Sequence, residues 1–378
     1  MDKKELFKKN IHDYISLVAS YLNKKTSSGF HLDDDNFKFF LKLSKNHSLT
    51  ALLYKAIKDT KVEIDSEKLK GLEEYYLSVI RRGVLFEKER KELYEYLNSN
   101  QIDFLPLKGL ILKEYYLDSY TREFADNDIL FDNSNSDKIK KYFTSKGYLV
   151  ELYKKSNHDV YQKKPFFNFE MHRDLFQENE DYPKYISYFK NYLKDSPIKE
   201  GYEHVLSKEN FYIYFTAHSY KHFHLSGCGI RTLIDYYLYL KNNDLDFNYI
   251  NEELNKLDLL DFSNNISKLS LKLFDNEPLN EEEEETLLFI ASSGTYGTLK
   301  NRVNKGVKEK GKFGYFMSRV FPPYSFYKTA YPWAYKTIIL IPVAWTCRLF
   351  RVIFKNPKRA SNELKMISKT KKEDQKEN

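Results

Sequence analysis

Cysteine is scarce in this chain: Cys228 and Cys347 are the two thiols among 378 residues. Two cysteines are too few for a disulfide framework or for a zinc site made of thiolates. The segment MDKKELFKKN at the start is charged and contains no apolar stretch, so we expect no signal peptide. Together these two deficits predict a cytoplasmic protein.

Long apolar runs are also missing. The most apolar stretch, Thr337 to Cys347, is interrupted by Pro342 and flanked by Lys336 and Arg348. A helix needs roughly 20 apolar residues to cross a bilayer about 30 Å thick. We therefore predict a buried helix here, and the alternative is peripheral membrane contact through residues 331–354.

Aromatic and charged residues, in contrast, are plentiful. Aromatics make up 16% of the chain, chiefly as 32 Tyr and 28 Phe, and such large side chains are expected to fill the core. Hydrophobic residues at 42% and charged residues at 30% are typical of a soluble globular protein. The formal net charge of +7 favours an anionic partner, either a nucleotide, a nucleic acid or an acidic membrane surface.

The pattern of the chain changes twice along its length. Helical spacing of apolar residues dominates residues 1–100, short apolar segments with turn residues dominate 101–180, and helices return over 181–354. In the last part, Asn280 and five following Glu predict a helix start, and NRVNKGVKEKGKFG predicts a basic loop. Residues 355–378 are polar and mostly basic, so we expect a disordered tail.

The middle region alternates predicted strands and helices, which indicates a small α/β core. IDFLPLKG is predicted as a strand that enters a turn, LILKEYYL as a helix and DNDILFD as a strand edge. A helix over residues 137–147 and strands over 148–153, 159–162 and 166–172 follow.

Two carboxylates flank an amide in the sequence Asp126-Asn127-Asp128. In an extended segment alternate side chains share a face, so both carboxylates point one way and Asn127 points the other. Two like charges side by side repel, and a hard divalent ion with oxygen ligands, Mg²⁺ (or Mn²⁺), resolves this repulsion. An acidic turn is the plainer interpretation.

A third acid lies in FNFEMHRD, where Glu170 and His172 alternate with apolar residues. On a neighbouring strand Glu170 would complete a two-metal site for phosphoryl or nucleotidyl transfer. His172 would contact a phosphate, assist proton transfer or orient Glu170. The structural alternative is an amphipathic edge strand.

A glycine turn precedes these acids. In LPLKG, Gly109 between strand and helix lets backbone N–H groups approach a phosphate, and Lys108 adds a positive charge. Strand-to-helix turns also use glycine for geometry alone.

The order LPLKG, helix, TREFADNDIL, strands, FEMHRD resembles a family of uncharacterised bacterial nucleotidyltransferases within the polymerase-β-like superfamily. HSLTALLYKAI upstream and AHSYKHF with GIRTLIDYYLYL downstream are similar to that family too. The resemblance implies an α+β fold with a small mixed-sheet nucleotidyltransferase core flanked by N- and C-terminal helical regions. It departs from active members at Leu110, where a small residue usually follows the turn glycine.

The resemblance also implies roles for the residues that match. Asp126, Asp128 and Glu170 would bind the metal, with His172 as a further catalytic residue, while Lys108, Gly109 and Arg122 would hold the nucleotide. In the downstream helices Arg231 would meet a phosphate, or it would form an ion pair with Asp235 four residues later. His218, His222 and Asp235 would line the site or, as an alternative, bind a metal.

We therefore predict a metal-dependent nucleotidyltransferase that uses a nucleoside triphosphate. The family resemblance favours a sugar, small metabolite or peptide as acceptor over RNA. Two alternatives remain at this point: a toxin-like enzyme acting on tRNA or protein, and a non-catalytic protein of the same fold that docks on a partner or membrane.

Overall fold

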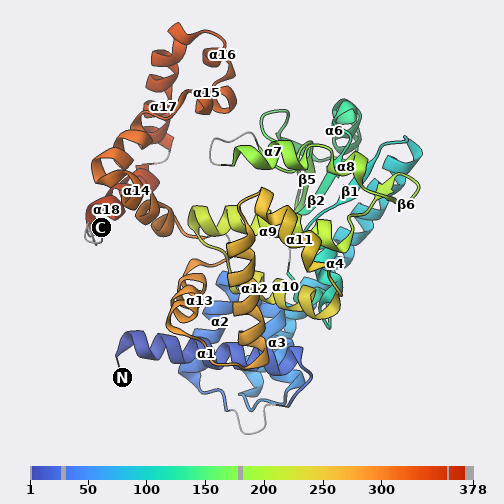
Figure 1. Cartoon of the computed structure of the whole chain (residues 1–378), viewed down its shortest axis with the longest axis vertical. Helices are drawn as coiled ribbons and strands as arrows, with labels where there is room; N and C mark the ends of the chain where they lie inside the picture. The colour runs from blue at the N-terminus through green and yellow to red at the C-terminus, as the bar shows by residue number, and fades with distance from the viewer. Residues whose placement is uncertain are drawn as a thin grey trace. The chain divides into compact units, whose positions relative to one another are not determined.

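The computed structural model describes residues 2–26, 31–123, 125–177, 182–295, 297–355 and 357–370 (Figure 1). These residues form two compact units. The larger unit comprises residues 1–221 and 229–295, and the smaller comprises 222–228 and 296–378. The fold is α+β, as predicted.

Four helices begin the larger unit: α1 (Lys3–Leu22), α2 (Asp34–His47), α3 (Thr50–Asp59) and α4 (Ser66–Ser99). Helices α2 and α3 are separate because Ser48, between them, adopts a left-handed conformation with φ of 53°. Helix α1 packs against α3 and against α12 (Leu260–Asp275), and α12 in turn packs against α10 (Ile230–Asn242), so helices from far along the chain lie beside the N-terminal ones (Figure 1). The N-terminal helices are therefore an integral part of this unit.

The described strands form one sheet in the order β3-β4-β5-β2-β1-β7-β6. Their bounds are β1 (Phe104–Pro106), β2 (Asn127–Phe131), β3 (Leu149–Leu152), β4 (His158–Lys163), β5 (Phe167–His172), β6 (Ile198–Glu200) and β7 (Glu203–His204). The sheet is mixed, because β2 runs parallel to β5 and antiparallel to β1. The five strands of the central region are confirmed, whereas β6 and β7 lie outside the region predicted to hold the sheet.

One face of the sheet is apolar and covered by helices. Phe169 and Met171 of β5, with Ile129 and Phe131 of β2, are buried against α4 and against α6 (Ser136–Ser145). On the other face the same strands carry Asp128, Asn168, Glu170 and His172, together with the apolar Leu130. The hydrophobic contacts thus hold the strands and leave the polar face for the site.

The remaining helices of the larger unit follow the sheet. They are α7 (Pro183–Phe189), α8 (Tyr192–Asp195), α9 (Lys208–Ser226), α11 (Phe247–Lys256) and α13 (Glu281–Ser293), and the last turn of α9 belongs to the smaller unit. Helix α13 begins where the sequence predicts. Asn280 accepts a hydrogen bond from the Glu283 backbone N–H at 2.8 Å, and the Glu283 side chain accepts from the Asn280 N–H at 2.9 Å. Most of the acidic run is therefore a capped helix start, not a metal site.

The smaller unit is helical where the sequence predicts loop and disorder. The predicted basic loop is part of α14 (Leu299–Val320), which is kinked at Gly311 with φ of 70°. Most of the predicted disordered tail is α18 (Pro357–Lys369), and residues 371–378 lie outside the described part. Both helices form because Ile367 packs against Val303 and Val307 across the pair.

The apolar stretch near residue 340 forms η4 (Ile338–Leu340) and α17 (Ile341–Lys355), after the short helices α15 (Tyr324–Ala330) and α16 (Pro332–Tyr335). The prediction of a buried helix is wrong for most of its apolar residues. Ile338 is 71% exposed, Ile339 84% and Val343 51%. Within the described ranges no helix combines the length and apolar character needed to cross a membrane.

Candidate active site

The three predicted carboxylates come together at the polar face of the sheet. Asp128 of β2 lies in register with Glu170 of the parallel neighbour β5, and Asp126 precedes β2 by one residue. Asn127 points to the other face, where its Oδ1 accepts a hydrogen bond from Arg90 of α4 at 3.0 Å. The predicted alternation around Asn127 is therefore present in the structure.

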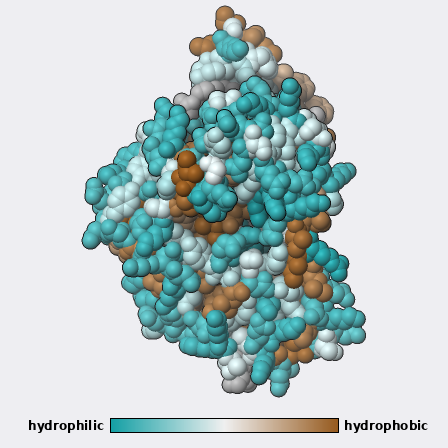
Figure 2. All heavy atoms as spheres, turned by 90° about the vertical axis from the view of Figure 1, so that its right-hand side faces the viewer, coloured by the Kyte–Doolittle hydropathy of each residue, from teal (hydrophilic) through white to brown (hydrophobic). Residues whose placement is uncertain are grey.

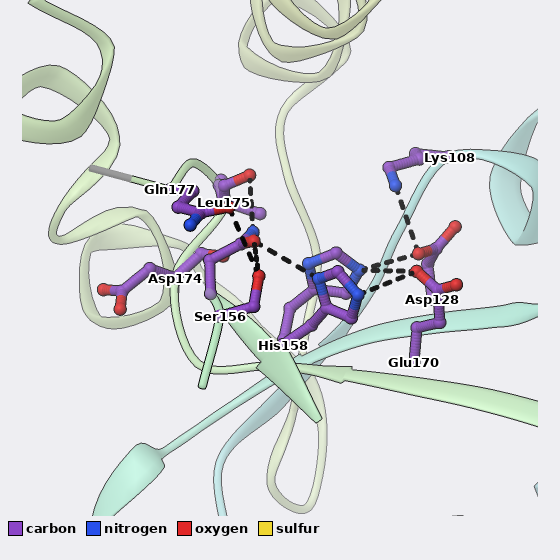
Figure 3. A network of polar contacts seen from close by, with 10 residues as sticks. Lys108, Asp128, Ser156, His158, Glu170, Asp174, Leu175 and Gln177 are labelled. Atoms are coloured by element: carbon purple, nitrogen blue, oxygen red, sulfur yellow. Dashed lines mark hydrogen bonds and ion pairs between the residues drawn. The ribbon is translucent and has the colours of Figure 1, made fainter. Parts of the chain in front are cut away.

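Asp128 is the most enclosed of the three acids and has two basic partners. The Lys108 Nζ donates to its Oδ1 at 3.1 Å, and the His172 Nε2 lies 2.7 Å from the same oxygen (Figure 3). All three side chains are largely buried. The strand that carries Glu170 thus also supplies a polar contact to Asp128.

The carboxylates perturb one another strongly. Burial and the charge of Asp128 raise the pKa of Asp126 to about 6. Burial and the charges of Asp128 and Asp126 raise the pKa of Glu170 to about 7. Burial would likewise raise the pKa of Asp128, but Lys108 and His172 hold it below its ordinary value. Such a divergence among adjacent acids is typical of functional sites, because it separates groups that hold a proton from groups that carry charge.

His158, at the start of β4, is a site residue that sequence analysis missed. The antiparallel register places it directly opposite His172, with ring centroids 5.1 Å apart. Its Nε2 lies 3.8 Å from Glu170 Oε2, and Figure 3 shows its ring directed toward Glu170 and Asp128. The sequence signal for His158 was a polar residue at the start of the strand before FNFEMHRD. The contact of His158 with His172 depends on the pairing register of β4 and β5, which this signal does not reveal.

Helix α9 contributes two further residues that the sequence analysis did not select. Tyr214 is fully buried, and its hydroxyl has no hydrogen-bond partner among the described residues. Lys221 is half-buried, and its pKa is lowered by burial and by the charge of Lys108. Both side chains lie close enough to Asp128 and Glu170 for mutual electrostatic effects. Residues 214 and 221 are two turns apart, so both lie on one face of α9.

The turn between β1 and α5 (Gly109–Leu112) is built for close packing. Lys108 has a positive φ of 43°, and a Cβ at Gly109 would come within 2.6 Å of the Arg122 Nη1. Leu110, the departure from the family pattern, is buried in the apolar cluster with Ile129. Glycine is therefore required here by the guanidinium beside it.

Arg122 forms a buried ion pair that the sequence analysis did not predict. Its Nε and Nη2 each donate to Asp235 of α10 at 2.8 Å, and Tyr116 donates to the same carboxylate at 2.7 Å. All three residues are buried. Arg122 therefore joins the core to α10 in a bidentate pair, and its charge also lowers the pKa that burial raises at Asp126. Its contact with the nucleotide stays a prediction.

The same pair changes the interpretation of the downstream helices. Asp235 is engaged by Arg122 and Tyr116, and among the described residues it forms no intrahelical ion pair with Arg231. The role predicted for His218 and His222 stays a prediction. Arg231 instead donates to the Glu123 carbonyl at 2.6 Å, and its charge lowers the pKa that burial and Asp128 raise at Asp126. Among described residues the single group of His, Cys and acidic side chains with metal-like spacing is His158, Glu170 and His172.

A cavity of about 540 Å³ lies elsewhere, beside β1 and β7. Leu105, Leu110 and Tyr239 are among its lining residues, and its described lining includes none of the three carboxylates. The cavity is therefore separate from Asp126, Asp128 and Glu170.

Comparison with known proteins identifies the family of the chain. A family model described as "Uncharacterised nucleotidyltransferase" matches residues 33–275, a range that contains every carboxylate and basic residue of the site. Neither a curated protein nor a solved structure gave a significant match. The matched range covers well over half of the chain, and the chain therefore belongs to this family of uncharacterised nucleotidyltransferases.

Proposed function

We propose that this protein transfers a nucleoside monophosphate from a nucleoside triphosphate to an acceptor hydroxyl or phosphate. An acceptor oxygen forms a bond to the α-phosphorus, the bond to the β-phosphate oxygen breaks, and pyrophosphate leaves. The observation that carries the proposal is the register of Asp128 with Glu170 on adjacent parallel strands, with Asp126 nearby. Family membership supports the general activity.

The donor set fits a divalent cation. Three carboxylates crowd together, and their mutual repulsion is visible in the raised pKa of Asp126 and Glu170, for which burial is the first cause. Oxygen ligands of this kind suit Mg²⁺ or Mn²⁺, and Asp126, Asp128 and Glu170 would hold the ion. When bound, such an ion neutralises charge on the phosphates and lowers the pKa of an attacking oxygen.

The side chains around the acids have complementary tasks in this proposal. Glu170 would bind the ion and help to deprotonate the acceptor, whose oxygen it would face from β5. Lys108 and Lys221 supply positive charge for the triphosphate, and His172 holds Asp128 in place through its 2.7 Å contact. Arg231 and Arg122, whose charges both lower the pKa that burial raises at Asp126, are further candidates for a phosphate contact.

The reaction is tested by label transfer. Purified protein is incubated with each α-³²P nucleoside triphosphate, Mg²⁺ or Mn²⁺ and cell extract, and labelled products are separated. Asp128→Asn removes a carboxylate of the site, and we expect it to abolish labelling. Asp132→Asn is the matched control, because Asp132 caps a surface turn and Asn retains that cap. Equal labelling by wild type and Asp128→Asn would contradict the proposal, and absence of both labelling and nucleotide binding would favour a non-catalytic protein.

The acceptor is proposed to be a sugar, a small metabolite or a peptide, and the labelled product identifies it. RNA is the competing acceptor, because the chain has a formal net charge of +7. Labelled material that resists protease and disappears with ribonuclease would establish RNA. Retention of the label after ribonuclease supports the small-molecule or peptide acceptor.

We propose in addition that the smaller unit binds an anionic membrane surface. Four exposed residues of α17, Val343, Cys347, Phe350 and Phe354, recur at helical spacing and form one stripe. Ile338 and Ile339 extend it, and hydrophobic atoms gather at the upper end of Figure 2, where α15 to α17 lie. The sequence contains no Asp or Glu between Glu309 and Glu363, while exposed Lys336 and Arg351 add positive charge. An apolar stripe with basic residues fits lipid headgroups of negative charge.

Vesicle co-sedimentation of the full chain tests this surface. We expect binding to vesicles with phosphatidylglycerol, weaker binding to phosphatidylcholine alone, and loss of binding in Phe350→Glu/Phe354→Glu. Leu149→Glu is the control, since Leu149 is 71% exposed and lies on β3. Equal sedimentation of the double variant and the wild type would refute the membrane surface.

A further inference from the structure

The polar face of the sheet carries nitrogen ligands as well as carboxylates. His158 and His172 are a cross-strand pair on β4 and β5, and Glu170 lies two residues before His172 on the same face. One ligand atom from each of these three residues lies within 4.8 Å of the other two. The backbone register, and not the conformation of one long side chain, brings them together.

The spacing of the donor atoms suits a single ion. Glu170 Oε2 is 3.8 Å from His158 Nε2 and 3.9 Å from His172 Nε2. Ligands about 2.0–2.2 Å from one ion lie roughly 3–4 Å from each other. Asp128 Oδ1, 2.7 Å from His172 Nε2, lies beside the group and can supply a fourth ligand. In the metal-free arrangement this short contact is a hydrogen bond, and an ion would take the place of its proton.

The chemistry of the donors selects the kind of ion. Mg²⁺ prefers oxygen ligands and keeps several waters, whereas imidazole nitrogens suit first-row transition metals. We propose that His158, Glu170 and His172 bind a divalent transition-metal ion, Mn²⁺, Co²⁺ or Zn²⁺, in preference to Mg²⁺. Glu170 then serves both this site and the carboxylate group with Asp126 and Asp128. The inference deepens the proposed function by naming the metal preference of the site, but metal binding itself does not require transfer activity.

Pulsed electron paramagnetic resonance of the full chain with Mn²⁺, without nucleotide, tests the site directly. A bound imidazole couples its ¹⁴N nucleus to the manganese spin, whereas carboxylates and water do not. We expect nitrogen coupling in the wild type and Mn²⁺ binding that survives a large excess of Mg²⁺. Manganese bound without nitrogen coupling, or displaced by an equal concentration of Mg²⁺, would overturn the inference.

Variants separate this site from other histidines. His158→Gln removes a ligand whose side chain is 24% exposed, and we expect Mn²⁺ affinity to fall at least about tenfold with loss of part of the nitrogen coupling. His31→Gln alters an exposed imidazole outside the group, and we expect wild-type behaviour. Unchanged coupling in His158→Gln would assign the nitrogen elsewhere and refute this ligand set. Nitrogen coupling without label transfer would sink the proposed function alone, and label transfer with Mg²⁺ but no nitrogen coupling would sink this inference alone.

Discussion

The two faces of strands β2 and β5 differ in chemical character, although one backbone carries both. On one face Ile129, Phe131, Phe169 and Met171 are buried among helices, and on the other Asp128, Glu170 and His172 crowd together. On the apolar face, each side chain removed from water stabilises the folded state. The polar face concentrates like charges, which costs free energy.

This contrast shows how the fold can hold an unfavourable cluster of acids. A strand alternates its side chains by geometry, so burial of Phe169 and Met171 forces Glu170 and His172 to the opposite face. A one-residue slip of β5 would expose the aromatic residues and bury the acid in the core. The core face therefore fixes the geometry on which the site face depends.

The largest expected effect comes from the core face. Phe169→Ala should lower the free energy of unfolding by about 3–5 kcal/mol, because Phe169 is 1% exposed and contacts Phe143 and Tyr148. Urea denaturation followed by circular dichroism measures the change. Leu149→Ala, at a 71% exposed position, should change stability by less than about 0.5 kcal/mol. Similar losses in the two variants would remove the distinction between the faces.

On the site face, removal of a charged side chain should raise the free energy of unfolding instead of lowering it. Glu170 has a pKa of about 7 in the folded chain against an ordinary value of 4.5, with burial as the main cause. The unfolded chain therefore releases this proton at lower pH than the folded chain does. The contribution of Glu170 to the free energy of unfolding is fully present below about pH 4.5 and is lost as the pH rises from there through about 7. Glu170→Gln should remove this loss and raise stability at pH 8 by on the order of 1–3 kcal/mol without added metal.

Thermal denaturation of wild type and Glu170→Gln between pH 4 and pH 8 tests this expectation. The two curves should converge below about pH 4.5, separate progressively as pH rises, and reach their full difference near pH 7. Addition of Mn²⁺ should restore the wild type at pH 8, because an ion that binds the native state stabilises it. Parallel curves over the whole range would mean that Glu170 carries no unfavourable charge.

Arg122 belongs to neither face, and its buried charge is paired with Asp235 of α10. Arg122→Lys keeps the charge but loses the bidentate contact with Asp235, so we expect a stability loss of about 1–3 kcal/mol. The KM for the nucleoside triphosphate should stay near the wild-type value if the residue only positions α10. A large rise in KM with unchanged stability would instead return Arg122 to the nucleotide.

Much of the site was predictable from local patterns. The alternation in FNFEMHRD and the pair around Asn127 identify which residues share a face, because a period of two needs no tertiary information. The structure places Asp126, Asp128, Glu170 and His172 on that face. Their adjacency across strands followed from the family resemblance, since local pattern does not specify which strands pair.

What local pattern could not reveal depends on distant pairing. Arg122 and Asp235 are separated by 113 residues, so their pairing becomes visible only when α10 packs against the core. His158 joins the site through the β4–β5 register, and Lys221 through the packing of α9. The helix α18 was missed because its polar composition suggested a tail, whereas Ile367 buries against α14.

Lys221 gives the smallest expected effect. It lies on helix α9 and not on the sheet, so its variant tests whether a helix contributes to the polar site. Its charge is sensed by Glu170 and Asp128, so removal should weaken triphosphate binding more than it affects folding. We expect Lys221→Ala to raise KM for the nucleotide about tenfold, or about 1.4 kcal/mol, with unfolding free energy within about 0.5 kcal/mol of wild type. Lys256→Ala, on the surface of α11, should leave KM unchanged. If both variants show the same KM, Lys221 does not bind the nucleotide, and the cationic contribution comes from Lys108 and the arginines near Asp126.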